Sequence, residues 1–439
     1  MKKLLVSKYA PFLWRYGMPP IDIRKTNNIL DKIAHYGTAR KTPPTKGQLK
    51  VTLLIGTLGA GGSEQQAVYL AAELKKRGIA VTILTIQPLE GPKAYHLPFL
   101  RTSGIPVTSV FEATDPDTDY SKLKLFNDTP DLPPPLQTSY RIAEQINSSK
   151  PSILHCWLDE TNIQGAIAGI ITKTPGIMLA TRSVNPSHFS KTLSWTKRWY
   201  RILLTNRHIA IINNSNAGAI DYSNWIGIKK ERIEVINNGI YVDHEEAKKY
   251  SLDRWNIGKE NEVILGIMRL TKEKRPVLFL KSCILILKRR PLSTVVLIGD
   301  GPMLKQIKIL VENSGVKERI KLIGTARNTQ QFLKMSDILI LTSSKEGSPN
   351  VLIEAQSVGC PVLTTAAGGA VETLIHGKTG FIVPDHPRKI AQKACEILEN
   401  RTLRSSLSAA GPTFIADKYS MDKMVNQTLK LYNRILGPI

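Results

Sequence analysis

Residues 337–360 read DILILTSSKEGSPNVLIEAQSVGC, and this stretch decides the fold class. Its apolar run, ILIL, has the composition of a buried strand. A polar loop follows and ends at Ser348, which suits a helix N-cap; Pro349 suits the first helical position, and Gly359 suits the helix end. We therefore predict a strand, a short loop and a helix, which is the unit that α/β proteins repeat.

The start of this predicted helix is a natural site for an anion. Its free backbone N–H groups and the positive end of the helix dipole point in the same direction. Two carboxylates, Glu346 and Glu354, flank the site at a separation of eight positions. Carboxylates do not hold phosphate, but they accept hydrogen bonds from hydroxyl groups. The arrangement therefore indicates a site for phosphate that is joined to sugars.

The same alternation of apolar runs and amphipathic helices extends over the chain from residue 49 onward. It predicts an α/β protein with two doubly wound parallel sheets. In the first half we expect strands at 51–58, 79–86, 107–111, 152–158, 176–183 and 208–215, and in the second at 263–268, 294–298, 320–323, 337–342, 361–365 and 380–383. Helices are expected near 63–78, 137–148, 162–172 and 192–205 in the first half, and near 276–290, 302–313, 328–334, 349–358, 370–376 and 387–400 in the second. The predicted parts are a basic extension (1–48), two Rossmann-like domains (49–238 and 239–415) and a C-terminal helix (416–439) that returns to the first domain.

The composition limits the partners and the compartment. The chain has 439 residues and a formal net charge of +24, which indicates an acidic partner: nucleic acid, an anionic membrane surface or a phosphorylated substrate. The four cysteines are scattered without a C-x-x-C spacing, which is typical of reduced thiols in a cytoplasmic protein. We find no segment apolar enough to span a bilayer, and no signal-peptide core.

Two basic segments leave alternatives open. Residues 1–48 carry a net charge of +8, and they are either a solvated extension or an arm that touches anionic lipid. Residues 190–207 combine Trp195, Trp199 and Tyr200 with five Lys and Arg side chains. This segment is either a connecting helix with one buried face or a helix that lies on an anionic membrane.

Five motifs in order resemble those of the retaining glycosyltransferases of family 4, which have the GT-B fold. Together they are far more specific than any one of them. The first is the pair of glutamates with seven residues between them, and the second is a following strand–loop unit. The others resemble a phosphate clamp, an interdomain segment and a first Gly-rich loop. In this chain they are Glu346 to Glu354, Gly369 to Pro384, Gly266 to Lys274, Ile236 to Ile240 and Leu58 to Glu64.

The resemblance implies roles for residues of the second domain. Glu354 would bind the donor ribose. The catalytic residues would be Glu346, which would contact the hydroxyls of the transferred sugar, and Arg269 and Lys274, which would contact the diphosphate. Fixed cations stabilise the negative charge that builds on a departing nucleoside diphosphate. The remaining donor-binding residues would be Gly347, Ser348, Pro349, Asn350 and Arg327. No metal or other cofactor is expected, because these cations already answer the charge.

For the acceptor side the resemblance implies Gly61 and Gly62, with Asn162 and Arg182. The glycine spacing does not match G-x-G-x-x-G, so a simple strand–helix turn is an equal alternative. Arg182 stands where many family members carry a His; it cannot act as a base, but it can hold phosphate or an acidic sugar. The D-x-D at 115–117 looks like a solvated acidic loop rather than a metal site.

The expected function is transfer of a sugar, with retained configuration, from a nucleotide-sugar donor. The donor would be a UDP-sugar, and the acceptor a hydroxyl of a glycan or lipid-linked glycan in bacterial surface polysaccharide assembly. We expect a cytoplasmic protein that can lie at the inner face of the membrane, without a nucleic-acid partner. The rival hypotheses are a GT-B epimerase of nucleotide sugars, a basic nucleic-acid-binding protein and an inactive GT-B scaffold.

Overall fold

The computed structural model describes residues 49–111, 134–189, 196–241, 257–258, 260–326 and 328–437. Within these residues the chain forms two compact units. The first comprises the residues up to 214, 219–236 and those from 425 onward, and the second comprises 215–218 and 237–424. None of the helices in the described ranges combines the length and the apolar composition that a bilayer crossing requires.

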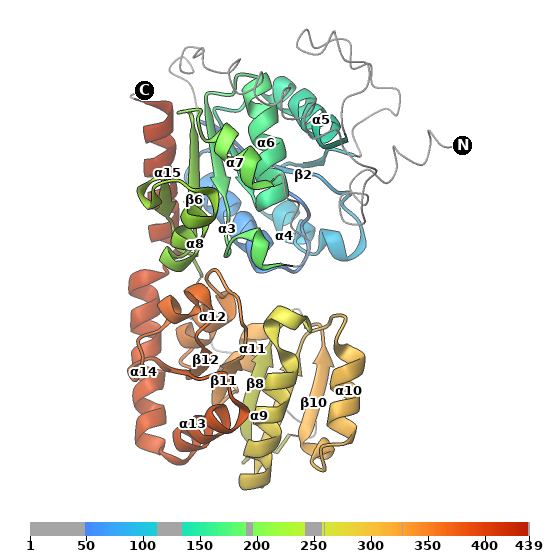
Figure 1. Ribbon diagram of the computed structural model, residues 1–439, viewed down its shortest axis with the longest axis vertical. Coiled ribbons are helices and arrows are strands. Elements are labelled where there is room, and N and C mark those ends of the chain that lie inside the picture. Colours follow the sequence, from blue (N-terminus) through green and yellow to red (C-terminus); the bar gives the residue numbers. More distant parts are fainter. Residues whose placement is uncertain are drawn as a thin grey trace, which may run out of the picture. The chain divides into compact units, whose positions relative to one another are not determined.

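The first unit is built on a seven-stranded parallel sheet of order β3-β2-β1-β4-β5-β6-β7 (Figure 1). Its neighbouring strands all run parallel, as the alternating pattern predicts. The strands are β1 (Lys50–Ile55), β2 (Ala80–Thr85), β3 (Val107–Ser109), β4 (Ile153–Trp157), β5 (Gly176–Ala180), β6 (Ile209–Asn213) and β7 (Ile233–Val235). The sequence predicted six of these strands and missed β7.

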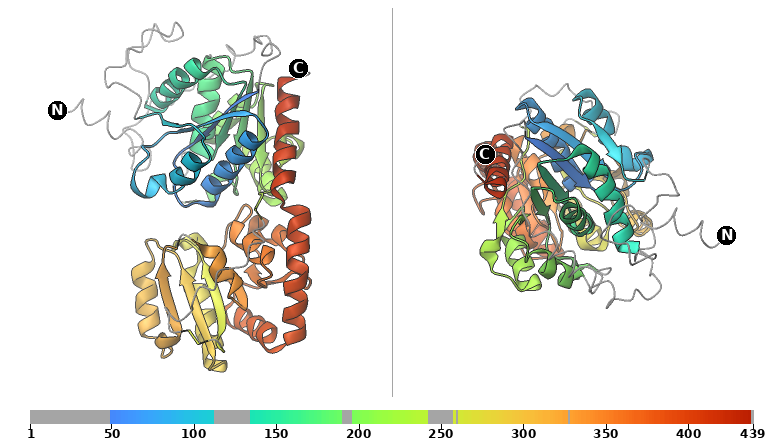
Figure 2. Two further views of the ribbon diagram at one scale, coloured as in Figure 1. Left: turned by 180° about the vertical axis from the view of Figure 1, so that it is seen from behind. Right: turned by 90° about the horizontal axis from the view of Figure 1, so that it is seen from above.

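Helices lie on both faces of this sheet. One face carries α5, α6, α7 and α8, whose apolar side chains form one core with Leu54, Leu154 and Leu179. The view from behind shows α3, α4 and α15 on the other face (Figure 2). The bounds are α3 (Gly62–Lys76), α4 (Leu97–Thr102), α5 (Pro134–Ser149), α6 (Asp159–Ile171), α7 (Thr196–Leu203), α8 (Asn216–Ile226) and α15 (Met421–Leu436).

The second unit has a six-stranded parallel sheet of order β10-β9-β8-β11-β12-β13. All six strands were predicted, because each is a short apolar run bounded by polar loops. They are β8 (Glu262–Ile267), β9 (Ser293–Ile298), β10 (Ile320–Gly324), β11 (Ile338–Leu341), β12 (Val362–Thr365) and β13 (Gly380–Val383). The helical elements are α9 (Pro276–Arg289), α10 (Leu304–Glu312), α11 (Thr329–Lys334), α12 (Asn350–Ser357), η8 (Gly368–Thr373), α13 (Pro387–Glu399) and α14 (Arg401–Lys418).

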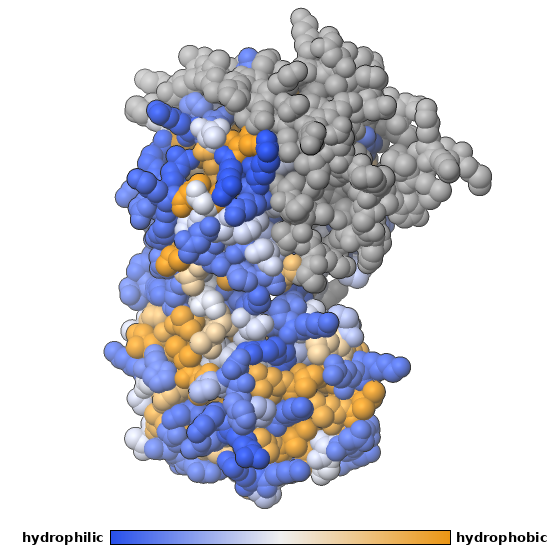
Figure 3. Space-filling model, in the orientation of Figure 1, coloured by the Kyte–Doolittle hydropathy of each residue, from blue (hydrophilic) through white to orange (hydrophobic). Residues whose placement is uncertain are grey.

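The side chains of these strands alternate between two separate cores. On one face Ile264 and Ile338 pack against α9, α10 and α13. On the other face Leu265 and Leu339 pack against α11, α12 and η8. Burial on both faces explains why these strands are continuous apolar runs rather than alternating ones. On the visible surface of this unit, apolar residues gather beside charged ones (Figure 3).

Two details of the expected layout differ from the structure. Helix α12 begins at Asn350 with Pro349 as its N-cap, so Ser348 is not the cap residue that the sequence predicted. The segment expected as a helix at 370–376 is the 3-10 helix η8, which begins and ends earlier. Gly359 ends α12 as expected, since its φ of +78° is the left-handed conformation that glycine adopts without strain.

Candidate functional site

The candidate site lies where the strand order of the second sheet reverses. Strand β8 pairs with β9 on one side and with β11 on the other. The chain therefore continues from β8 toward one edge of the sheet, and from β11 toward the opposite edge. In open α/β sheets, ligands bind outside the carboxyl ends of the strands at such a switch point. Arg269 and Lys274 follow β8, and Glu346 follows β11. The topology thus brings together residues that are more than seventy positions apart.

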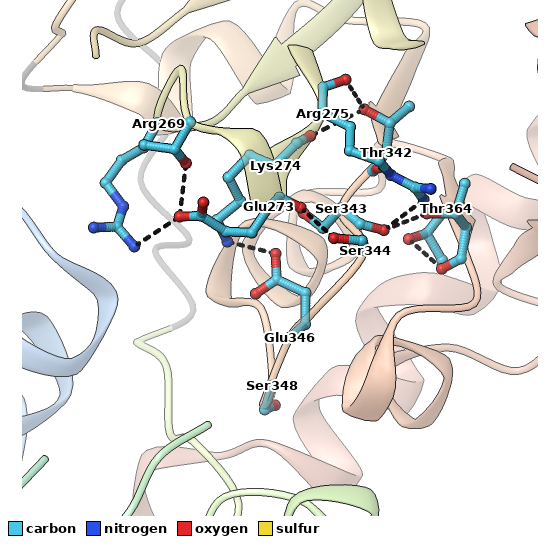
Figure 4. A network of polar contacts seen from close by, with 12 residues as sticks. Arg269, Glu273, Lys274, Arg275, Thr342, Ser343, Ser344, Glu346, Ser348 and Thr364 are labelled. Carbon is cyan, nitrogen blue, oxygen red and sulfur yellow. Dashed lines mark hydrogen bonds and ion pairs between the residues drawn. The ribbon is translucent and has the colours of Figure 1, made fainter. Parts of the chain in front are cut away.

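The centre of the site is an ion pair between Lys274 and Glu346. The Lys274 Nζ atom donates to Glu346 Oε1 at 2.5 Å (Figure 4). The side chains are 18% and 9% exposed, so the pair is largely withdrawn from water. The resemblance predicted a role for each residue but not their direct contact. In the free protein, the cation expected to meet a diphosphate is therefore neutralised by the carboxylate expected to meet the sugar.

Arg269 has a different environment. Its side chain is 73% exposed, and its guanidinium lies 3.9 Å from Glu273 Oε1. The Thr271 hydroxyl donates to the same Glu273 oxygen at 2.7 Å. An exposed pair at this distance contributes little to stability. Arg269 is thus a cation near the site whose ion pair with Glu273 is long and exposed.

The loop between β11 and α12 is fixed from several sides. The main-chain O of Glu346 accepts from the N–H of Gly369 at 3.1 Å. The Nδ2 of Asn238 donates to the carbonyl of Ser348 at 2.9 Å and to Oδ1 of Asn350 at 2.6 Å. These contacts determine where the first turn of α12 begins. No sequence pattern indicated that Asn238 anchors this turn.

Three glycines that the sequence reasoning did not assign shape the site. A Cβ atom on Gly369 would lie 1.7 Å from the carbonyl O of Gly347. A Cβ on Gly299 would lie 1.8 Å from Met268 O, and one on Gly301 would lie 2.7 Å from Leu270 O. Only glycine allows these close approaches of main chain. The sequence signal in both places is a loop with small residues shortly after an apolar strand. These loops are Gly299-Asp-Gly301 after β9 and Ala367-Gly-Gly369 after β12.

Of the two other charged residues predicted to bind the donor, the structure describes Glu354 but not Arg327. Glu354 lies in α12, one helical turn beyond Asn350, and it is partly exposed. On a helix, residues four positions apart share a face, so this carboxylate lies on the side of the helix that begins at the site. Arg327 lies outside the described residues, as do the aspartates at 115–117. Within the described ranges, no group of three or more His, Cys, Asp or Glu side chains could hold a metal ion.

In the first unit, Gly61 and Gly62 lie at the start of α3, directly after the loop that follows β1. The Glu64 carboxylate folds back over this turn, 2.1 Å from where a Cβ on Gly61 would lie. The Glu64 carboxylate also accepts from the Thr57 hydroxyl at 3.4 Å. An acid in the first turn favours the helix but disfavours an anion at the same place. The geometry therefore supports the strand–helix turn that the sequence left as an alternative.

Arg182 is buried, although arginine is almost always exposed. It has a φ of +58°, and its guanidinium lies over the Trp157 ring at 4.6 Å from the centroid. Burial lowers the pKa of Arg182 to about 9. The same burial, and then the charge of Arg182, hold the pKa of His155 well below its usual range. His155 Nδ1 contacts the Tyr432 hydroxyl of α15 at 2.8 Å.

Asn162 does not have the open position that an acceptor contact requires. It is completely buried in α6. Its Nδ2 donates to Ala180 O and to the Tyr200 hydroxyl, and its Oδ1 accepts from Ala180 N at 3.1 Å. These bonds satisfy the end of β5 in the same way that a neighbouring strand would. We therefore correct the expected acceptor role of Asn162 to a structural one.

A half-buried carboxylate begins the same helix. Asp159 accepts from the hydroxyl of Tyr200 at 2.7 Å and from that of Tyr222 at 2.8 Å. Burial raises the pKa of Asp159 to about 6, and the two hydroxyls oppose that shift. The aromatic residues of the basic segment therefore serve this network and the core. Trp199 and Tyr200 are buried, which supports a connecting helix rather than one with an aromatic face on a membrane; Trp195 lies outside the described residues.

Comparison with known proteins agrees with this architecture. The model of the family "Glycosyl transferases group 1" matches residues 248–414, and that of "Glycosyltransferase Family 4" matches residues 60–244. The solved structure of HepE from Anabaena, in complex with UDP and glucose, has a TM-score of 0.71 at 20% identity. That match covers 88% of this chain and 99% of HepE. The fold is therefore GT-B, as the resemblance implied.

Two curated relatives cover most of the chain. The Vi polysaccharide biosynthesis protein VipC/TviE of Salmonella typhi is 25% identical over 410 residues, which is 87% of this chain and 71% of the relative. An undecaprenol-linked glycan α-1,4-N-acetyl-D-galactosaminyltransferase of Campylobacter jejuni is 25% identical over 362 residues, 82% of this chain and 91% of the relative. The matched families, the fold and the paired glutamates agree: the chain belongs to the family 4 glycosyltransferases and is a GT-B glycosyltransferase.

Proposed function

We propose that this enzyme transfers a sugar from a UDP-sugar to a hydroxyl of a glycan or lipid-linked acceptor, with retention of configuration. The observation that carries this proposal is the Lys274–Glu346 pair at the switch point of the second sheet. A cation and a carboxylate in contact suit a substrate that presents a diphosphate next to sugar hydroxyls. The complex of HepE with UDP and glucose supports UDP as the nucleotide.

The roles of the residues follow from charge. Departure of UDP builds negative charge on the diphosphate, which Lys274, Arg269 and the positive end of the α12 helix dipole would stabilise. Glu346 would accept hydrogen bonds from the sugar, and Glu354 from the ribose. The leaving phosphate would accept the acceptor's proton on the same face of the sugar. In this proposal the two cations make a metal ion unnecessary for transfer.

The proposed setting is surface polysaccharide assembly in the cytoplasm. The relatives from Salmonella typhi and Campylobacter jejuni support a polysaccharide or lipid-linked acceptor. The four cysteines are free and buried, which suits a reducing compartment. The net charge of +24 supports peripheral contact with anionic lipid at the site of a lipid-linked acceptor.

The test begins with binding. Thermal unfolding is measured with UDP, GDP, ADP and CMP, each with magnesium and with a chelator. A ligand at about 100 times its Kd stabilises by about 2.7 kcal/mol, which shifts the melting temperature measurably. We expect UDP to stabilise equally with and without metal. Stabilisation by another nucleotide alone, or only with magnesium, would contradict the donor or the metal-free part of the proposal.

Transfer is tested next with a panel of UDP-sugars and lipid-linked glycan acceptors. Proton NMR of the product reports its anomeric configuration, and retention is the expected result. Incubation without acceptor separates the alternatives, because an epimerase changes the nucleotide sugar on its own. A product of inverted configuration would contradict the retaining mechanism while leaving the donor site intact.

A further inference from the structure

Arg275, the residue that follows Lys274, has an unusual backbone conformation. Its φ of 50° and ψ of 53° place it in the left-handed region, at the N-cap of α9. A residue with a Cβ is strained there, and glycine is the natural choice. A non-glycine residue at such a position needs an explanation from what its side chain does.

The guanidinium of Arg275 reaches into the loop that leads to Glu346. Its Nε donates to the carbonyl of Thr342 at 2.7 Å, and its Nη2 donates to the carbonyl of Ser343 at 2.9 Å. Nη2 also donates to Thr365 Oγ1 at 3.2 Å, and that hydroxyl donates to Ser343 O at 2.7 Å. Two of the three nitrogens are thus used on carbonyl groups that lie beyond the end of β11.

The contacts are returned from the other side. The hydroxyl of Thr342 donates to the carbonyls of Lys274 and Arg275 at 3.2 and 3.1 Å. The N–H of Ser344 donates to the carbonyl of Glu273 at 2.7 Å. Residues 273–275 and 342–344 are therefore joined side by side, next to the Lys274–Glu346 pair (Figure 4).

We propose that Arg275 is a positioning residue, which holds the 342–346 loop so that Glu346 meets Lys274 in the geometry that transfer requires. The inference rests on the proposed function of that pair. Arginine suits this task because its planar fork donates in fixed directions to two carbonyls at once. The strained backbone is the cost of aiming the side chain from the residue next to Lys274.

Asp385 provides a matched control. It accepts from Nη1 of Arg275 at 2.5 Å, but its side chain is 65% exposed. The hydrogen bond from Arg275, and then its charge, lower the pKa of Asp385. An exposed pair of this kind contributes little. Removing it leaves the two carbonyl contacts in place, so Asp385→Asn separates loss of the ion pair from loss of positioning.

The experiment compares the full-length protein with Arg275→Gly, Arg275→Lys and Asp385→Asn. In Arg275→Gly the backbone strain is relieved, so we expect a melting temperature within a few degrees of wild type. We expect kcat to fall roughly 100-fold, as misplaced reacting groups cause, while the donor KM changes less than about threefold. Arg275→Lys keeps the charge but not the fork, and it should stay at least about tenfold below wild type. Asp385→Asn should keep wild-type kcat.

Hydrogen exchange gives a readout that does not need turnover. Peptides that cover 342–350 should exchange at least about tenfold faster in Arg275→Gly, while those from β9 should not change. Unchanged exchange at 342–350, or wild-type kcat in Arg275→Gly, would overturn the proposal. A parallel loss of stability, UDP affinity and kcat would also overturn it, because that pattern indicates a merely structural role. Wild-type protein that neither binds UDP nor transfers sugar would refute the proposed function instead, and the exchange result would still decide the loop's anchoring.

Discussion

The Lys274–Glu346 contact leads to an unusual expectation for Glu346→Gln: the variant binds UDP more tightly and yet transfers sugar far more slowly. In the free protein Glu346 occupies Lys274 at 2.5 Å. A diphosphate must share that ammonium with the carboxylate and tolerate its negative charge. Glutamine has the same shape but no charge, so it removes this competition.

The size of the effect follows from the distances. A phosphate oxygen on the far side of the ammonium would lie about 5 Å from the carboxylate, given a charge-assisted hydrogen bond of about 2.8 Å. Repulsion of two unit charges at that distance costs about 0.8 kcal/mol in water and about 3 kcal/mol at an effective dielectric constant of 20. The pair is partly exposed, so we expect about 1 kcal/mol, or roughly fivefold tighter UDP binding.

The assay is calorimetric titration of UDP into wild type, Glu346→Gln and the control Glu312→Gln, together with transfer rates. Glu312 pairs with Lys317 on the surface of the same unit, so its substitution changes net charge equally away from the site. We expect transfer by Glu346→Gln to fall by about a hundredfold or more, because the neutral amide makes weaker hydrogen bonds to the sugar in the transition state than the carboxylate does. A variant that binds UDP tenfold more weakly, or that turns over normally, would refute this reasoning.

Three further outcomes are expected. Arg269→Ala should leave the unfolding free energy within about 0.5 kcal/mol of wild type, because its contact is exposed, but lower kcat/KM about 10- to 100-fold; a denaturant titration and donor kinetics check both. Gly369→Ala should abolish transfer and lower the melting temperature, because its Cβ would lie 1.7 Å from a carbonyl; a normal melting curve would contradict this. Asp159→Asn should flatten the dependence of stability on pH. The pKa of Asp159 rises from 3.8 to about 6 on folding, so its protonated form adds stability that is present below pH 4 and lost as the pH passes 6. This shift corresponds to at most about 3 kcal/mol of unfolding free energy, and partial exposure of Asp159 makes the real contribution smaller. If the unfolding free energy of wild type and Asp159→Asn changed equally between pH 4 and 7 in chemical denaturation, this expectation would be refuted.

Much of the fold could be predicted from the sequence because the strands of the second unit are buried on both faces. Each one is an apolar run that stands out between polar loops. Strand β7 was missed because it has only three residues, one of them buried, which is too short for a recognisable pattern. Helix α8 was missed because its sequence, NAGAIDYSNWI, begins with residues that are typical of loops.

The site was predictable only in part, because sequence fixes which side chains follow a strand but not what they touch. Glu346, Lys274 and Arg269 were identified through the resemblance, and the parallel sheet brings the loops that carry them together. The partners of Asn162 could not be foreseen, since its side-chain amide in helix α6 binds the main chain of Ala180, eighteen positions away at the end of strand β5. Arg275 carried no signal, because its left-handed backbone becomes visible only in three dimensions.

The bonds between residues 273–275 and 342–344 end mostly on main-chain carbonyls. Such acceptors persist whatever side chains the loop carries, so the geometry of the proposed donor site is insulated from sequence drift at the positions proposed to face the sugar. Selection, or a library, could therefore vary residues 347–349 to change which sugar is accepted while the bond of Asn350 to Asn238 is kept. A catalytic frame maintained in this way is easy to inherit and to respecialise, and this makes the protein a suitable starting point for engineering new glycan linkages.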